Sequence, residues 1–217
     1  MFKHVDLKAR KRAIRGSFGT SLSLRVHRAL SWLDRAERET DDDDARFLFL
    51  WIAFNAAYAN EIHDRGNLTE RRLLLTFLNR LVDSDRKDLI YEIVWNQFSS
   101  SIRMLLHNKF VYQPFWDCQS GLISEDDWSQ AFARSKASAN RALGRKNTKR
   151  VLAEIFDRLY TLRNQIVHGG STWSSAVNRN QKRDGANILG FLVPTIIHLM
   201  MVNHRQVWGD ACYPVVD

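Results

Sequence analysis

Apolar residues recur every three or four positions along most of this chain, the spacing that gathers side chains on one face of an α-helix. Leu22, Val26, Leu30 and Leu33 form one such face near the N-terminus. Residues 47–59 are almost all apolar, which is typical of a helix at the centre of a bundle. The pattern predicts one helix that follows Thr69 and others over about 21–39, 44–62, 86–107, 124–143, 148–168 and 186–208.

Glycine and proline are scarce, with ten and three residues in a chain of 217. A β-sandwich or barrel needs turn residues roughly every 8–12 positions. The composition therefore favours an all-α helical bundle. We expect a single helical domain over residues 20–217, with loops at 108–123 and 171–185. Residues 1–19 carry six basic side chains against one acid, and we expect them to form a mobile basic N-terminal arm.

The chain has no feature that predicts export, membrane insertion or a metal centre. Its N-terminus lacks the apolar run of a signal peptide, and the apolar stretches 47–59 and 188–202 are shorter than the roughly 20 residues that cross a bilayer. Cys118 and Cys212 form no metal-binding pattern. His198 and His204 do not share a helical face, and the aspartates at 41–44 suit a helix start. We expect a cytoplasmic protein without a cofactor or membrane partner.

Candidate chemistry gathers at the end of the helix predicted over 148–168. On an ideal helix with Leu152 at zero, the apolar stripe falls between about 280° and 40°, and Arg163 lies inside it at about 20°. Asn164 and His168 lie at about 120° and 160°, on the neighbouring flank. An arginine at the edge of an apolar stripe needs a partner, because an unpaired buried guanidinium is costly.

This helix end combines a permanent cation, an amide and a titratable imidazole. Such a set can bind a phosphodiester and transfer protons near neutral pH without a metal ion. The alternative is structural: His168 would complement the helix C-terminus, and Arg163 would pair with a nearby acid.

Residues 163–169, RNQIVHG, resemble the RNxxxHG form of the Rx4–6H motif of HEPN domains. In that superfamily the motif lies near the C-terminal end of a helix in an all-α bundle. Residues 49–58, FLWIAFNAAY, also resemble the early core helix of HEPN proteins, especially the Apea-like group. The resemblance covers about residues 20–205 and implies an all-α, HEPN-like helical bundle with additional helices. Gly170 stands where a subgroup of the family has a tyrosine, so regulation by modification of that tyrosine does not carry over.

The resemblance implies a metal-independent endoribonuclease in which two motifs meet across a homodimer. Arg163 and His168 would be the catalytic pair, and Asn164 would support them. The resemblance also implies a toxin-like or antiphage effector, with an inhibitor or antitoxin protein as a partner. The ideal helix leaves Arg163 and His168 about 140° apart. Distortion at Gly169, the reach of the arginine, or a site shared across a dimer could each bring them together.

The net charge of +8 is concentrated in places that suit a polyanion such as RNA. Residues 129–150 hold seven basic side chains and no acid, and three more follow in the loop at 171–185. A solvated helix face is the alternative. The candidate RNA-binding residues are Arg134, Lys136, Arg141, Arg145, Lys146, Lys149, Arg150, Arg179, Lys182 and Arg183.

Asn55 is the strongly polar residue of the apolar stretch 47–59. It either satisfies a backbone carbonyl in the core or orients Arg163 or His168. Two other functions stay open for the whole chain. It could be a non-catalytic module that binds RNA or nucleotides, or a helical interaction protein whose basic faces serve a partner. Salt-sensitive RNA binding and loss of cleavage on changing His168 would separate the three.

Overall fold

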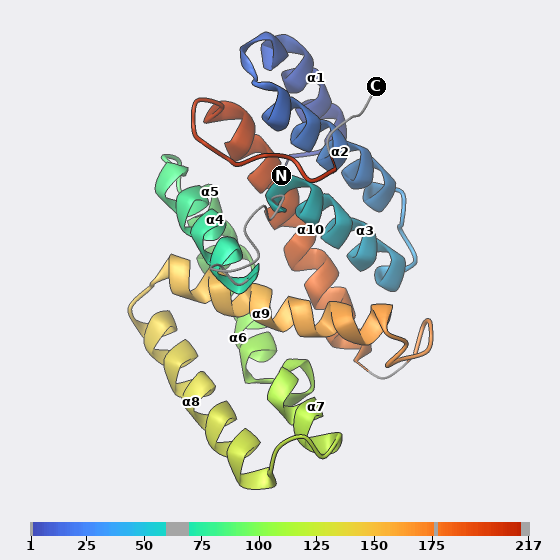
Figure 1. The fold of residues 1–217 in the computed structure, drawn as a ribbon, viewed down its shortest axis with the longest axis vertical. Helices are drawn as coiled ribbons and strands as arrows, with labels where there is room; N and C mark the ends of the chain where they lie inside the picture. Colours follow the sequence, from blue (N-terminus) through green and yellow to red (C-terminus); the bar gives the residue numbers. More distant parts are fainter. Residues whose placement is uncertain (1, 60–69, 176–177, 214–217) are drawn as a thin grey trace. The chain divides into compact units, whose positions relative to one another are not determined.

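The computed structural model describes residues 2–59, 70–175 and 178–213. Within these ranges the secondary structure is helical, without a β-strand, and the all-α prediction is confirmed (Figure 1). The α-helices are α1 (His4–Ile14), α2 (Thr20–Glu37), α3 (Asp43–Tyr58), α4 (Glu70–Ser84), α5 (Leu89–Glu92), α6 (Ser99–His107), α7 (Gln113–Gln119), α8 (Glu125–Gly144), α9 (Thr148–Val167) and α10 (Arg179–Val202). Short helical turns lie at Arg15–Ser17, Ile93–Gln97 and Lys109–Val111.

The chain forms two compact units, whereas the sequence predicted a single domain over residues 20–217. Residues 1–89 and 186–217 make up the first unit, and residues 90–185 make up the second. The boundaries between the units fall within α5 and α10. The single domain over residues 20–217 stays a prediction.

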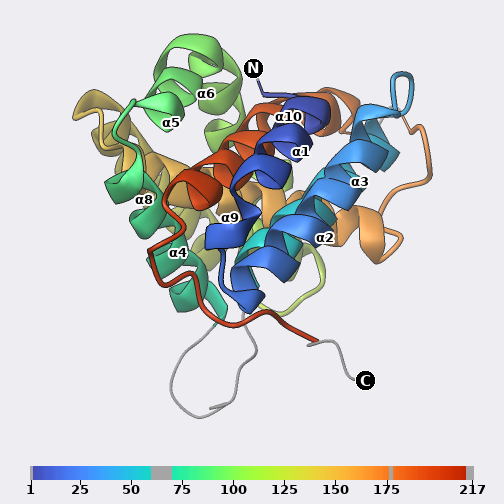
Figure 2. The same ribbon diagram turned by 90° about the horizontal axis from the view of Figure 1, so that it is seen from above.

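In the first unit, α2 and α3 pack side by side along their lengths (Figure 2). Asp42 begins α3 by accepting a hydrogen bond from the Ala45 backbone N–H at 2.9 Å, as the run of aspartates predicted. Phe47 and Phe54 of α3 are fully buried, and so are Val193 and Ile197 of α10. The apolar helices of the sequence pattern therefore form the core of this unit.

The predicted basic arm is wrong, because residues 4–14 form the helix α1. Leu7 is buried, and the backbone N–H of His4 donates to the Glu37 carboxylate at 2.9 Å. The His4 imidazole also lies 3.2 Å from the Asp34 carboxylate. These contacts dock α1 on α2. Periodicity does not predict this docking, since a single leucine and polar contacts replace the usual apolar stripe.

The buried Arg25 and the half-buried Arg28 bind the C-terminal segment within the first unit. The Arg25 guanidinium is 1% exposed and donates to the carbonyls of Ala57, Ala59 and Asp210 at 2.5–2.9 Å. Burial lowers its pKa to about 10. Arg28 donates to the carbonyls of Cys212 and Tyr213 at 2.5 and 2.6 Å. These charge-assisted bonds satisfy carbonyls that the irregular segment would otherwise leave unpaired.

The helix α10 is long and apolar enough to pass a length-and-composition test for a membrane span. However, 83% of its most apolar window is buried inside the protein. Pro194 lies within this helix without ending it. Burial of this extent is that of a core helix, as expected for residues 188–202.

The second unit departs from the predicted helix over 86–107 and from the predicted loops. Residues 93–97 form a π-helical turn in which the Phe98 N–H donates to the Ile93 carbonyl at 3.1 Å, and this turn separates α5 from α6. The expected loop at 108–123 contains the short helix α7. The expected loop at 171–185 ends early, because α10 begins at Arg179.

Candidate functional site

The helix α9 carries the RNQIVHG motif of residues 163–169 in the second unit. Asn147 begins the helix by accepting the Arg150 backbone N–H at 3.0 Å. Leu152, Ile155, Phe156, Leu159 and Leu162 are fully buried, which confirms the predicted apolar stripe. Packing of this stripe fixes the rotation of α9 and so determines which face the motif presents.

Two glycines end α9 in a Schellman motif. The Gly170 N–H donates to the Gln165 carbonyl at 2.7 Å, and the Gly169 N–H donates to the Ile166 carbonyl at 3.3 Å. Gly169 has a φ of +72°, a left-handed conformation that favours glycine. This turn directs the chain away immediately after His168, so the imidazole lies at an ordered helix end.

Arg163 is half-buried and has the partner that its position required. Its guanidinium donates to the Asn164 side-chain oxygen at 3.0 Å. The neighbouring amide thereby orients the guanidinium while part of the arginine stays open to solvent. An oriented, solvent-accessible guanidinium can donate to the oxygens of a phosphate.

His168 is exposed, and its backbone N–H donates to the Asn164 carbonyl at 2.9 Å. Within the described ranges its imidazole forms no hydrogen bond, ion pair or ring contact. A histidine needed for packing or for a buried network would have such contacts. The ring is therefore accessible to a substrate that approaches the end of α9.

Gln165, which the sequence interpretation did not single out, anchors the motif. Its side-chain N–H donates to the Phe110 carbonyl at 2.5 Å, and its oxygen accepts from Asn178 at 3.0 Å. Trp116 donates to the same Phe110 carbonyl at 2.8 Å. These bonds join the end of α9 to segments on both sides of it in the sequence. No spacing rule predicts them, because the partners are a backbone carbonyl and a side-chain amide at distant positions in the sequence.

Arg158 is the deeply buried arginine of α9, although the sequence analysis placed only Arg163 near the apolar stripe. It is 1% exposed and donates to the Ser135 hydroxyl at 2.7 Å. Its guanidinium also lies over the Tyr112 ring, 4.5 Å from the ring centre. These contacts make Arg158 a structural residue that joins α9 to α8 and to the start of α7.

An exposed strip runs along α9 beside the motif. Tyr160 and Val167 are 40% and 49% exposed, and they lie seven residues apart, so they share one face of the helix. Arg163 and Asn164 lie between them on that face. Partly exposed apolar groups around a polar pair are typical of an interaction surface.

The predicted RNA-binding residues of α8 and the following turn fall into two groups. Arg134, Arg141, Arg145 and Lys146 are exposed, and the Lys146 ammonium donates to the Tyr91 hydroxyl at 3.1 Å. Lys136, Lys149 and Arg150 are less available. Lys136 is half-buried, with its ammonium 5.0 Å from the centre of the Phe132 ring, and Lys149 is half-buried. Arg150 pairs with Glu154 at 2.7 Å and bonds Ser138. The open cations therefore lie mainly toward the C-terminal end of α8.

The predicted RNA-binding residues Arg179, Lys182 and Arg183 are less available to RNA than those of α8. Lys182 is 2% exposed, so its assignment to an RNA-binding surface is wrong. Helix α10 begins three residues before it and turns the ammonium inward, whereas the sequence analysis had placed it in a loop. Arg179 donates to the Ser174 carbonyl at 2.8 Å, and Arg183 is exposed beside the Asp184 carboxylate at 3.8 Å.

Asn55 lies in α3 and is half-buried. It belongs to the first unit, whereas Arg163 and His168 belong to the second. Its proposed support of the motif stays a prediction. Among the described residues, no group of three or more histidine, cysteine, aspartate or glutamate side chains is arranged to hold a metal ion.

Comparison of the chain with protein-family models, curated proteins and solved structures finds no match. The candidate site therefore has to be judged on its own geometry and on the resemblance of its motif.

Proposed function

We propose that this chain is a metal-independent endoribonuclease of the HEPN type, with Arg163 and His168 as its catalytic pair. The observation that carries the proposal is the end of α9, where the exposed His168 imidazole, which has no partner among the described residues, follows a guanidinium oriented by Asn164. Cleavage of RNA by attack of the RNA's own 2′-hydroxyl needs a group that transfers protons and a cation, and both are present at this helix end.

The proposed reaction is an internal transesterification. The ribose 2′-oxygen attacks the adjacent phosphorus, and the bond from phosphorus to the 5′-oxygen breaks. A histidine removes the proton of the 2′-hydroxyl, and a proton is returned to the leaving 5′-oxygen, so the products are a 2′,3′-cyclic phosphate and a 5′-hydroxyl. Arg163 donates to the non-bridging oxygens, which gain negative charge in the transition state. Asn164 keeps the guanidinium aimed at them.

A homodimer completes this site in our proposal. Arg163 and His168 point to different flanks of one helix, whereas two α9 ends around a twofold axis supply both groups to each phosphate. The exposed strip with Tyr160 and Val167 is the surface that would be buried between the copies. His168, protonated by the 2′-hydroxyl, would then return that proton to the leaving oxygen.

RNA would lie along the exposed cations at the C-terminal end of α8. Phosphate contacts by lysine and arginine supply most sequence-independent affinity for nucleic acid and make it salt-dependent. By the family resemblance, the enzyme would act in the cytoplasm as a toxin-like or antiphage effector under the control of an inhibitor or antitoxin protein.

The direct test is to incubate the purified chain with total RNA and map the ends of the products. We expect 2′,3′-cyclic phosphate ends, resistance to EDTA, and no cleavage at positions carrying 2′-deoxyribose. His168→Ala should lower the rate at least 100-fold, which is the lower range for loss of a general acid–base group. His107→Ala is the matched control, because His107 is also an exposed histidine of the second unit. Wild-type cleavage by His168→Ala would refute the assignment.

A non-catalytic RNA-binding module is the second candidate function. It is favoured by the exposed cations of Arg134, Arg141, Arg145 and Lys146, which need no chemistry to hold RNA. Salt-sensitive binding of RNA without any cleavage would select this function over the enzyme.

A further inference from the structure

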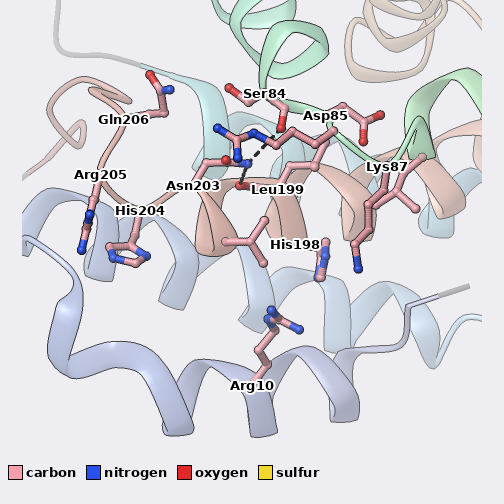
Figure 3. Close-up of a pocket in the computed structure, with 13 residues that line it drawn as sticks. Arg10, Ser84, Asp85, Lys87, His198, Leu199, Asn203, His204, Arg205 and Gln206 are labelled. Carbon is pink, nitrogen blue, oxygen red and sulfur yellow. Dashed lines mark hydrogen bonds between the residues drawn. The ribbon is translucent and has the colours of Figure 1, made fainter.

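The first unit contains a pocket of about 590 Å³ that lies outside the proposed ribonuclease site. It is bounded by α1, by the turn between α4 and α5, and by the C-terminal end of α10 with the residues that follow (Figure 3). Its volume falls within the range of pockets that bind small molecules.

The pocket is strongly cationic. Arg10, Arg86, Lys87 and Arg205 line it, against the single carboxylate of Asp85. In the part of the chain that the structure describes, none of these four cations forms an ion pair. Unpaired cations that face one another across a pocket repel each other, and an anion between them would relieve that repulsion.

His198 adds a buried polar group that lacks a partner. Its side chain is 8% exposed, and its Nδ1 atom has no hydrogen-bond partner within the described ranges. The Phe2 ring stacks on the imidazole with ring centres 4.1 Å apart. Burial, with the charges of Arg10 and Lys87, lowers the pKa of His198 to about 4. The neutral ring is therefore held beside two cations with an unused hydrogen-bonding atom.

The walls of the pocket are held in place by hydrogen bonds to backbone carbonyls. The Asn203 side-chain amide donates to the carbonyls of Ser84 and Leu199 at 3.3 and 3.0 Å and so joins the ends of α4 and α10 (Figure 3). In the turn that carries Lys87, the Asp88 N–H donates to the Asp85 carbonyl at 3.3 Å. A pocket that is formed in advance loses little entropy when it binds a ligand.

Helix ends explain part of this charge but not all of it. Arg86, Lys87 and Arg205 follow the C-termini of α4 and α10, where cations complement the helix dipoles. Arg10 belongs to a different helix and extends from α1 toward Lys87 and His198 (Figure 3). The dipoles of α4 and α10 account neither for its position nor for the imidazole without a partner.

We propose that this pocket binds a small phosphorylated molecule, with its phosphate held between Arg10 and Lys87 beside His198. A phosphate monoester presents several acceptor oxygens and up to two negative charges, which matches several cations better than a single carboxylate does. The pocket is much larger than a phosphate ion. The remaining volume, lined in part by Leu89, Leu199 and Val202, accommodates the organic part of the ligand.

Calorimetric titration of the full chain tests the proposal with three probes: inorganic phosphate, adenosine 5′-monophosphate and adenosine. We expect saturable binding of the monophosphate, weaker binding of phosphate, and no binding of adenosine. No saturable binding of either phosphate-bearing probe would overturn the proposal. Binding of adenosine as tight as that of the monophosphate would also overturn it, since the phosphate would then not be what is recognised.

Variants locate the bound phosphate. Arg10→Gln and Lys87→Gln should each weaken binding of the monophosphate roughly tenfold, about the effect of losing one charge-assisted hydrogen bond. Arg12→Gln removes the same charge from the exposed part of α1 outside the pocket and should leave the affinity unchanged. Arg205→Gln provides a second variant in the pocket if Arg10→Gln is poorly folded. Equal losses in Arg12→Gln and the pocket variants would refute the site.

Discussion

The backbone N–H of His168 donates to the carbonyl of Asn164 at 2.9 Å, so α-helical hydrogen bonding extends to His168, the residue before the glycine stop. The left-handed residue, Gly169, comes after His168. Distortion at that glycine therefore cannot rotate His168 toward Arg163, which was one of three ways to bring the pair together. The reach of the arginine and a site shared between two copies are left.

Mixing two inactive variants distinguishes these two arrangements. If Arg163 of one copy works with His168 of the other, a mixed dimer of Arg163→Ala and His168→Ala contains one intact site. Random mixing makes half of the dimers mixed, so about a quarter of wild-type activity should return. The measurement is RNA cleavage after co-expression of the two chains.

A control and a contrary result complete this experiment. Arg163→Ala mixed with the double variant Arg163→Ala, His168→Ala contains no intact site and should stay inactive. Formation of mixed dimers without recovery of cleavage would place both residues of each site on one chain.

Gly169→Ala should destabilise the protein by about 1 kcal/mol, the cost of a left-handed conformation for a residue with a Cβ atom. An added Cβ meets nothing within 4 Å, so the cost comes from the backbone and not from a clash. Cleavage should fall as well, because the turn that ends α9 after His168 is disturbed. Gly144→Ala is the control, since that glycine lies in α8 without a positive φ or a close neighbour. Equal stability of the two variants by denaturant unfolding would contradict this account of the turn.

Reversing charge on α8 and the residue after it should weaken RNA binding. Arg141→Glu with Arg145→Glu should lower affinity by tenfold or more and reduce the salt slope by roughly 1 to 2, as expected for two lost contacts to single-stranded RNA. Lys8→Glu with Arg12→Glu makes the same change in net charge on exposed residues of the first unit. Titrations at several salt concentrations measure both pairs. An unchanged affinity and slope for the α8 pair would place the RNA on a different surface.

Much of the fold and the outline of the site could be predicted from the sequence because both depend on periodicity. The Leu152 stripe and the glycine stop gave α9 and its C-terminal end almost to the residue. Long-range polar contacts could not be predicted in this way. The buried Arg25 and Arg158 are stabilised by carbonyls, a hydroxyl and a ring that lie far away in the sequence. The hydrophobic pattern places an arginine at the surface unless it falls within an apolar stripe, as Arg163 does. The burial of Arg25 and Arg158 was therefore not predicted.

The phosphate-binding pocket shows the same limit. Arg10 and Lys87 lie 77 positions apart in the sequence and His198 lies beyond both, so no local motif contains them. Docking of α1 onto the first unit is what brings Arg10 to the pocket. Because residues 1–19 were predicted to form a mobile arm, the sequence analysis assigned Arg10 no place in the fold.

His198 should make the stability of the protein depend on pH between its two pKa values. The pKa is about 4 in the folded protein, where burial and the charges of Arg10 and Lys87 oppose protonation, and about 6.5 in an unfolded chain. Between these values the unfolded chain binds a proton that the folded protein does not, so the free energy of unfolding falls as pH is lowered from 6.5 to 4.

His198→Gln should remove this contribution, which we expect to be on the order of 1 kcal/mol because solvent at the open side of the pocket screens the charges. The measurement is the difference in unfolding free energy between wild type and variant at pH 7 and at pH 4.5, which cancels the carboxylates common to both. Asp85, Arg86, His204 and Arg205 also line the pocket and are unchanged in the comparison.

The phosphate proposal adds a second expectation. A bound phosphate places negative charge beside the imidazole and raises its folded pKa, so the difference in pH dependence between wild type and His198→Gln should be smaller with the monophosphate bound; titration of the phosphate itself is common to both. A difference between wild type and variant that is the same at both pH values would show that His198 is not held neutral in this pocket.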